Sequence, residues 1–211
     1  MYTPAHFRLE DRAKLTAVIQ ANSFATLLTH GAKGLTASHL PFLYEASAGP
    51  HGTLYGHLAR ANWQWRDFSG QADAEALVIF QGEHGYISPT WYASPPAQNV
   101  PTWNYEVVHA YGVPRAVANS DLSADLLERM VRHFEPAGSS YSVRVHPPEF
   151  LARSLKAIVA LEIPVTRLEG KLKLSQNRTA EDVAGAIAGL EKTGEPAAMR
   201  LAAAMRRESQ P

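Results

Sequence analysis

Two short segments combine flat aromatic or amide side chains with groups suited to an anion. They are Val100-Pro-Thr-Trp-Asn-Tyr105 and Lys171-Leu-Lys-Leu-Ser-Gln-Asn-Arg178. A phosphate group requires positive charge and directional donors, which Lys, Arg and hydroxyl side chains supply. An aromatic ring offers a flat surface that can cover a heterocycle. This mixture predicts a site for a planar, phosphorylated organic cofactor.

A third segment, residues 56–65, repeats this mixture with Arg60, Asn62 and Trp65. An amide both donates and accepts hydrogen bonds, and therefore suits the polar edge of a ring. Upstream, Ser38 and His39 add a hydroxyl and an imidazole. We expect one site assembled from these segments. The candidate phosphate donors are Arg60, Lys173, Ser175, Gln176 and Arg178.

Each segment also has an interpretation that involves no ligand. Aromatic residues in strands usually belong to the core, and basic residues usually lie on a solvated face. These alternatives are core packing for Trp91 and Tyr92, a closed turn for Arg60 and Asn62, a solvated face for Lys171 and Lys173, and a helix approach for residues 175–179. The recurrence of one mixture in three segments favours the cofactor site.

Several common catalytic and binding motifs are missing from the sequence. It contains no phosphate-binding P-loop, no Gly-x-Gly-x-x-Gly after a strand and no Gly-x-Ser-x-Gly elbow. With no cysteine, thiolate catalysis, disulfides and Cys-ligated metals are excluded. The nine histidines occur singly, without the spacing that holds a metal from one element. An organic cofactor therefore remains the favoured ligand, although a metal held by distant histidines stays an alternative.

The overall charge argues against extensive contact with duplex DNA. The 211 residues contain 20 Lys and Arg and 20 Asp and Glu, which gives a formal net charge of zero. Duplex binding usually depends on surplus positive charge, so any such contact needs a local patch or a partner. The amino terminus lacks a signal-peptide profile, and no stretch approaches the ~18 apolar residues of a membrane span. We expect a soluble, cytoplasmic protein.

The chain must position these segments on short strands. Amphipathic spacing predicts helices over residues 11–22 and 122–134, the second capped by Asp121 or Ser123. Turn residues at 31–34 and 82–85 predict tight hairpins. Strands are expected over residues 24–29, 35–43, 52–57, 76–81, 84–87, 102–117 and 158–163. Repeated short strands favour a mainly β barrel or sandwich with flanking helices.

From Thr179 onward the composition becomes rich in alanine and typical of helices. Thr179 is the expected cap, Gly194 can end the first helix, and Pro196 can start the second. The predicted organisation is therefore one domain over residues 1–178 and a helical extension over residues 179–211. This extension is the one candidate for a helix–turn–helix, but an ordinary amphipathic pair is favoured.

Taken together, several segments resemble the PaiB family, in the order in which that family carries them. They are residues 1–7, His39-Leu-Pro-Phe42, Gly56-His-Leu-Ala-Arg-Ala-Asn62, residues 80–89, Val100-Pro-Thr-Trp-Asn-Tyr105, residues 109–112 and Lys173-Leu-Ser-Gln-Asn-Arg178. The match extends to about residue 190. Family members commonly carry proline after the Ala-Arg-Ala-Asn run, whereas this chain has Trp63.

The resemblance implies an FMN-binding split barrel of the kind found in pyridoxamine 5′-phosphate oxidases, normally a homodimer with flavin in grooves shared by both subunits. It implies that Arg60 and Lys173 neutralise the phosphate, helped by Ser175 and Arg178. Trp103 would cover a ring face or the dimer seam. The implied contacts to the ribityl chain or the ring edge are Ser38, His39, Asn62, Thr102 and Asn104.

The resemblance also implies a negative transcriptional regulator that acts on DNA directly or through a partner regulator. An FMN-dependent oxidoreductase or flavin reductase is the main alternative, since a flavin can pass electrons from a nicotinamide to a small acceptor. No residue stands out as a general acid or base, although His39, His84 and His109 are candidates by type. A haem-handling split barrel is a third alternative, and no histidine stands out as its axial ligand.

Overall fold

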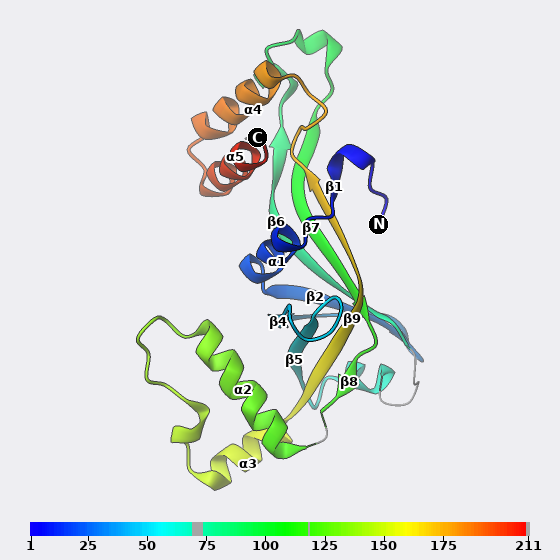
Figure 1. Ribbon diagram of the computed structural model, residues 1–211, viewed down its shortest axis with the longest axis vertical. Coiled ribbons are helices and arrows are strands. Elements are labelled where there is room, and N and C mark those ends of the chain that lie inside the picture. The colour runs from blue at the N-terminus through cyan, green and yellow to red at the C-terminus, as the bar shows by residue number, and fades with distance from the viewer. Residues whose placement is uncertain (69–73, 118, 210–211) are drawn as a thin grey trace. The chain divides into compact units, whose positions relative to one another are not determined.

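The structure, a computed structural model, describes residues 1–68, 74–117 and 119–209, and these form a mainly antiparallel sheet with five α-helices (Figure 1). The strands are β1 (Arg8–Leu9), β2 (Phe24–Gly31), β3 (Gly34–Pro41), β4 (Leu43–Glu45), β5 (Thr53–Ala59), β6 (Ala76–Ile87), β7 (Thr102–Gly112), β8 (Arg115–Ala116) and β9 (Ile158–Lys173). The helices are α1 (Arg12–Ala21), α2 (Ser120–Phe134), α3 (Pro148–Lys156), α4 (Ala180–Lys192) and α5 (Pro196–Ser209). The mainly β prediction is confirmed.

The sheet follows the hydrogen-bonded order β3-β2-β6-β7-β9-β5-β4, and β1 and β8 also pair with β9. The predicted hairpin at residues 31–34 is confirmed, because Gly31 pairs with Gly34 across β2 and β3. Gly34 has φ +85, a left-handed conformation that glycine adopts without strain. The predicted strand over residues 35–43 divides into β3 and β4, because Phe42 interrupts it.

The second predicted hairpin, at residues 82–85, is wrong. Residues 76–87 form one continuous strand, β6, in place of two. Gly85 serves close packing instead of a turn, because a Cβ there would lie 2.9 Å from Leu201. A glycine inside a strand often marks such a close approach.

Strand β9 is much longer than the predicted 158–163, since it continues to Lys173. The second half of β9 is rich in polar residues, so the apolar pattern that predicts strands does not extend over it. The strand therefore carries Lys171 and Lys173, which the sequence alone leaves outside any element. Helix α3 was not predicted either.

Side-chain hydrogen bonds cap the N-termini of α2 and α4. Asn119, and not the predicted Asp121 or Ser123, caps α2, and its side chain accepts from the backbone N–H of Asp121 at 2.7 Å. Thr179 caps α4 as predicted, accepting from the N–H of Asp182 at 3.2 Å. The predicted break also holds, since α4 and α5 flank residues 193–195.

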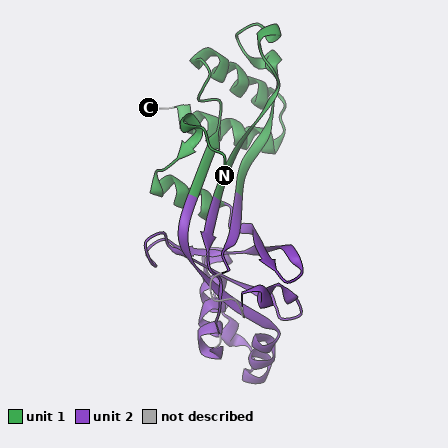
Figure 2. Cartoon of the chain, turned by 90° about the vertical axis from the view of Figure 1, so that its right-hand side faces the viewer, with its two compact units in different colours: residues 1–21, 81–108, 169–211 green, residues 22–80, 109–168 purple. Residues whose placement is uncertain are grey.

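The chain divides into two compact units (Figure 2). Unit 1 comprises residues 1–21, 81–108 and 169–211, and unit 2 comprises residues 22–80 and 109–168. Strands β6, β7 and β9 each contribute residues to both units. The predicted boundary between residues 178 and 179 lies inside unit 1.

Each unit has a buried apolar core. In unit 1, side chains from α1, β9 and α5 are buried, among them Leu15, Ile19, Leu172, Leu201 and Met205. In unit 2 the rings of Phe42 and Phe80 meet edge to face at 6.2 Å. Three of the buried polar side chains in unit 2 are linked by hydrogen bonds. The Thr29 hydroxyl donates to Asp67 at 2.7 Å and accepts from Gln64 at 3.1 Å.

Candidate functional site

A small pocket in unit 1 gathers five of the residues predicted to bind a cofactor. Its volume is about 130 Å³. Strand β7, the end of β9, the turn that follows β9 and the segment before β7 form its walls. The predicted residues in its lining are Thr102, Asn104, Lys173, Ser175 and Arg178.

Local backbone structure explains why these residues meet. Side chains two positions apart share one face of a strand, which places Thr102 and Asn104 together near the start of β7. Lys173 is the last residue of β9, and the chain then turns sharply at Ser175, whose φ is 72. Few non-glycine residues adopt this conformation, and they cluster at functional sites. The N–H of Arg178 donates to the carbonyl of Ser175 at 2.9 Å and closes the turn.

Lys173 supplies positive charge at the edge of the pocket. Its ammonium donates to the Thr102 hydroxyl and to the Trp103 carbonyl, both at 2.5 Å. Burial lowers the pKa of Lys173, and the nearby charges of Lys171 and Arg178 lower it further. A second positive group beside a partly buried lysine disfavours the charged form, whereas a bound anion would favour it.

Arg178 also lines the pocket. Its guanidinium donates to Asn99 Oδ1 at 2.6 Å and lies 4.7 Å from the centre of the Tyr92 ring. Asp182 lies nearby, but its two carboxylate oxygens accept from the N–H and the hydroxyl of Ser94, each at 2.9 Å. These hydrogen bonds, led by the Ser94 N–H, and the charge of Arg178 lower the pKa of Asp182.

The positive charge in this pocket is not neutralised by an ion pair. Within the described ranges, no carboxylate lies within ion-pair distance of Lys171, Lys173 or Arg178. Clustered cations without a counter-charge are costly in a partly buried place unless an anion binds them. The arrangement therefore favours an anionic ligand.

Two buried polar atoms in the pocket lack a hydrogen-bond partner among the residues that the structure describes. Asn104 donates through Nδ2 to Ser175 Oγ at 2.9 Å, but its Oδ1 has no donor. The Tyr92 hydroxyl is also buried and unpaired. Most buried polar groups are hydrogen-bonded, and exceptions call for an explanation. A phosphate oxygen can accept from Tyr92, and a neighbouring ligand hydroxyl can donate to Asn104.

The pocket volume limits what can enter. Sites that enclose a whole small-molecule ligand usually have about 300–1,000 Å³. At about 130 Å³, this pocket accommodates only one end of such a molecule. Charge, hydrogen-bonding atoms and size together fit a phosphate ester with a hydroxyl close to it.

Four predicted site residues lie in unit 2 and take part in hydrogen bonds with other groups of that unit. Asn62 donates to Ser38 Oγ at 2.8 Å, and its Oδ1 accepts from the N–H of Gln64 at the start of a short helix, η2 (Trp63–Asp67). His39 Nδ1 lies 3.0 Å from Thr26 Oγ1. Arg60 donates to the carbonyls of residues 156 and 158, both at 2.7 Å. In the structure, these Arg60 hydrogen bonds join two segments of unit 2.

Two more predicted residues belong to unit 1 but not to the pocket lining. Trp103 is 56% exposed, and its ring stacks on His84 with centroids 6.3 Å apart. Gln176 accepts from the N–H of Leu174 and donates to the carbonyl of Leu172, both at 2.7 Å. Its amide therefore holds the turn that positions Ser175.

Sequence reasoning missed other residues of the pocket. Phe7 lines it, and Asn99 orients Arg178 from outside the lining, whereas Val100 and Asn177, which also line it, belong to the two segments singled out in the sequence. Tyr92 was weighed only as a core residue, and it is both buried and part of the lining. The signal that could have found Asn99 is its position next to the Val100–Tyr105 cluster.

No group of three or more acidic or histidine side chains in the described residues is placed to hold a metal. Similarly, none of the helices that the structure describes is long and apolar enough to cross a membrane.

Comparison with known proteins identifies the family. Residues 1–167 match a family model described as "Putative FMN-binding domain". The chain is 34% identical over 205 residues to the Bacillus subtilis protein named protease synthase and sporulation protein PAI 2, covering 97% of this chain and 96% of that protein.

Solved structures with low sequence identity share the fold. The flavocytochrome Anf3 from Azotobacter vinelandii has a TM-score of 0.61 and 16% identity, covering 82% of this chain and 70% of that one. An FAD- and haem-binding protein from Mycobacterium smegmatis has a TM-score of 0.59 and 17% identity, with coverage of 84% and 78%. The predicted split-barrel fold is confirmed. The chain thus belongs to the PaiB family, whose characteristic domain binds FMN.

Proposed function

We propose that this protein binds FMN through the pocket in unit 1 and acts as a negative regulator of transcription. The observation that carries the binding assignment is the grouping of Lys173, Arg178 and two unpaired buried polar atoms in one cavity of phosphate size. Family membership supplies the identity of the cofactor, and the pocket chemistry supports where its phosphate binds.

Each residue of the pocket has a defined part in this proposal. Lys173 and Arg178 neutralise the phosphate, Thr102 and Ser175 offer hydroxyl groups to its oxygens, and Asn104 accepts from a ribityl hydroxyl. The bound flavin would supply redox chemistry, while the protein positions it and sets its surroundings. Contacts of Ser38, His39 and Asn62 with the ribityl chain or ring edge remain predictions.

We further propose a cytoplasmic homodimer. The pocket is too small for a whole flavin mononucleotide, so the ring must lie against another surface. A second copy would provide one, in line with the resemblance. Trp103, exposed and stacked on His84, offers flat area for such a seam.

The regulatory role rests on kinship with a protein named for protease synthesis and sporulation. The C-terminal extension gives little support for direct DNA contact. Arg200 is paired with Glu83 at 2.9 Å, and Arg206 with Glu191 at 2.5 Å, so much of its positive charge is neutralised. Duplex recognition needs a denser basic face. We therefore favour repression through a partner regulator.

Two measurements test this function. The purified protein should show a flavin absorption band and release one FMN per chain on denaturation, and a colourless protein that fails to take up added FMN would overturn the binding assignment. A gel-shift titration over several salt concentrations tests DNA contact separately. Retardation that weakens steeply with salt would show direct binding and contradict repression through a partner.

A further inference from the structure

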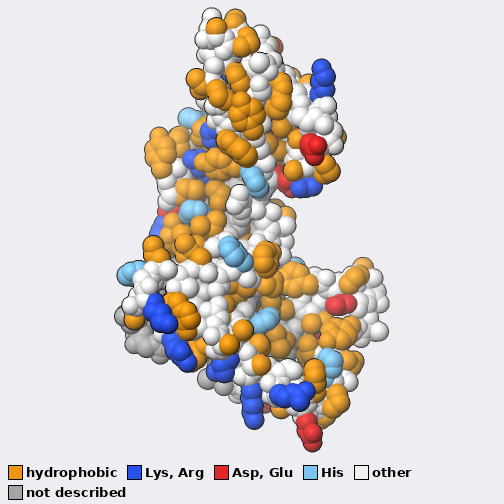
Figure 3. Space-filling view, turned by 180° about the vertical axis from the view of Figure 1, so that it is seen from behind, with side chains coloured by type: hydrophobic (Ala, Val, Ile, Leu, Met, Phe, Trp, Pro, Cys, Tyr) orange, Lys and Arg blue, Asp and Glu red, His pale blue; other side chains and the backbone are white. Residues whose placement is uncertain are grey.

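A second and larger cavity lies in unit 1, between α4, α5 and the turn after β9. Its volume is about 650 Å³, within the range of about 300–1,000 Å³ typical of small-molecule sites. On the face that Figure 3 displays, hydrophobic side chains gather over unit 1, with charged groups between them. The cavity lining includes Leu174, Arg178, Val183, Ile187, Ala188 and Met205.

The walls of this cavity are mainly apolar and well supported. Leu174, Val183, Ile187 and Met205 are all buried, so their side chains are fixed by the surrounding core. Helix α4 also contributes the small, exposed side chain of Ala188 to the lining. A flat apolar molecule would gain about 25 cal/mol for each Å² of apolar surface removed from water.

Of the three charged side chains in the cavity lining, two belong to ion pairs. Arg206 in the lining is paired with Glu191 at 2.5 Å, and Glu208 with Lys14 at 2.9 Å. Arg178 has no such carboxylate partner in the described part of the chain. A ligand with one acidic group therefore complements this site better than a neutral one.

The cavity adjoins the phosphate pocket, because Ser175 and Arg178 line both. Two ligands that share a wall can influence each other, and such coupling is reciprocal.

We propose that the cavity between α4 and α5 is a second ligand site, which takes one small molecule with a flat apolar body and a single acidic group. The apolar body lies against Val183, Ile187 and Met205, and the acidic group meets Arg178. This site goes beyond FMN binding, but it shares Arg178 with the proposed phosphate pocket, so FMN and the acidic ligand should compete for that side chain. A regulator with such a site could respond to an aromatic acid as well as to its flavin.

Fluorescence titration with 1-anilinonaphthalene-8-sulfonate, a flat aromatic anion, tests the proposal on the full chain. One probe should bind per chain in the absence of FMN. Ala188→Trp fills the cavity and should weaken binding at least tenfold. Ala203→Trp is the matched control, because Ala203 is exposed on α5 outside the lining, and it should bind like the wild type. Circular dichroism and thermal unfolding establish that both variants are folded.

The charge is tested with a neutral probe, N-phenyl-1-naphthylamine. Arg178→Gln should weaken binding of the anionic probe about tenfold and leave the neutral probe unchanged. Equal binding of the sulfonate to wild type and Ala188→Trp would overturn the proposal. The proposal would also be overturned if the wild type bound no probe and the Ala188→Trp variant dissociated a dimer. In that case the cavity would be an interface between two copies of the chain. If the wild type binds the probe but takes up no FMN, only the FMN assignment would be overturned.

Discussion

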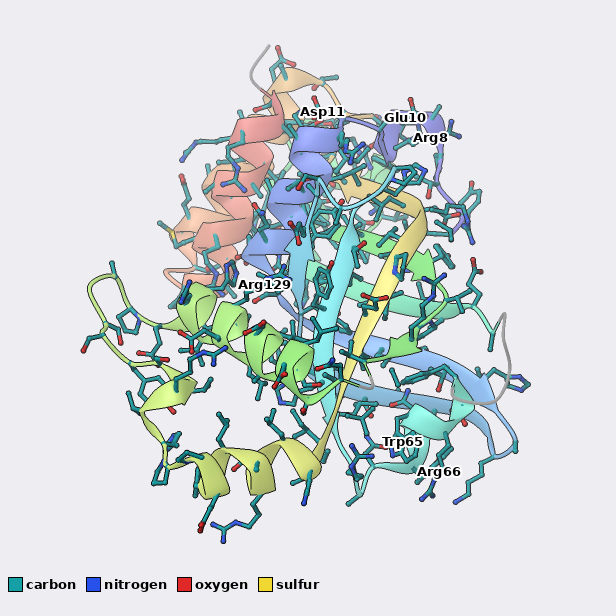
Figure 4. All side chains as sticks on the ribbon, turned by 60° about the horizontal axis from the view of Figure 1, so that its bottom comes forward. Arg8, Glu10, Asp11, Trp65, Arg66 and Arg129 are labelled. Atoms are coloured by element: carbon teal, nitrogen blue, oxygen red, sulfur yellow. The ribbon has the colours of Figure 1, made fainter. Side chains whose placement is uncertain are left out.

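The basic side chains of the phosphate pocket in unit 1 and those of unit 2 differ in their partners. In unit 2, Arg129 pairs with Glu45 at 2.7 Å and Arg144 with Asp125 at 2.5 Å, while Arg60 bonds backbone carbonyls. Figure 4 shows Arg129 on α2, and Trp65 and Arg66 next to each other on η2. In unit 1, Lys173 and Arg178 share one pocket without any carboxylate partner in the described residues.

This difference separates structural cations from cations available to a ligand. A paired arginine holds two segments together, whereas an uncompensated cluster gains stability only when an anion arrives. The surplus in unit 1 is local, because Arg200 and Arg206 in the same unit are paired. Position in the pocket, and not residue type, therefore predicts which side chains contact phosphate.

The largest expected effect is that of Lys173→Met on FMN affinity. Removing a charge-assisted contact should weaken FMN binding about 10- to 100-fold. Arg129→Met removes a paired cation from unit 2 and should leave the affinity unchanged. Isothermal titration with FMN measures both, and equal losses would erase the contrast between the units.

Gly185→Ala should destabilise the protein by about 1–3 kcal/mol, because over-packing forces the backbone to shift. A Cβ at Gly185 would lie 2.2 Å from the Trp91 carbonyl oxygen. The same shift should displace Tyr92 and weaken FMN binding. Chemical denaturation measures the free energy of unfolding, with the exposed Ala203→Ser on α5 as control. Unchanged stability would show that the 88–99 segment does not depend on α4.

Arg60→Met tests the same contrast between pocket cations and structural cations, because Arg60 was predicted to neutralise the phosphate but lies in unit 2. Loss of its two hydrogen bonds to carbonyls should lower the free energy of unfolding by about 1–2 kcal/mol. FMN affinity should fall less than in Lys173→Met. A loss of affinity equal to that of Lys173→Met, with stability intact, would assign Arg60 to the phosphate instead.

The smallest expected effect is the change of FMN affinity and of the free energy of unfolding with pH. Because burial lowers the pKa of Lys173, its charge is lost at a lower pH than that of an ordinary lysine. FMN affinity should therefore decline in the alkaline range as pH passes that value. The free energy of unfolding of the cofactor-free protein should instead rise between that value and the ordinary lysine pKa, since the unfolded chain binds more protons there. Lys173→Met should flatten both profiles, and parallel profiles in wild type and variant would contradict this role.

Local signals in the sequence predicted much of the fold. The Gly31–Gly34 turn and the capped helix at Thr179 depend on neighbouring residues, and both are confirmed. The pocket was partly predictable for the same reason, because Thr102 and Asn104, like Lys173 and Ser175, are close in sequence.

Features that depend on distant contacts were not predictable. Gly85 resembles a turn residue until Leu201 is known to pack against it. The hydrogen bonds from Arg60 to carbonyls nearly a hundred residues away could not be predicted either, and its role at the phosphate stays a prediction. The division into two units was also hidden, because each unit is assembled from segments far apart in the chain.

The most direct test of the central claim is a comparison of FMN with riboflavin, which lacks only the phosphate. If the unit 1 pocket binds the phosphate, the wild type should prefer FMN by about 100-fold or more, and Lys173→Met should lose most of that preference while its riboflavin affinity stays the same. Equal affinities of the wild type for FMN and riboflavin would contradict the account.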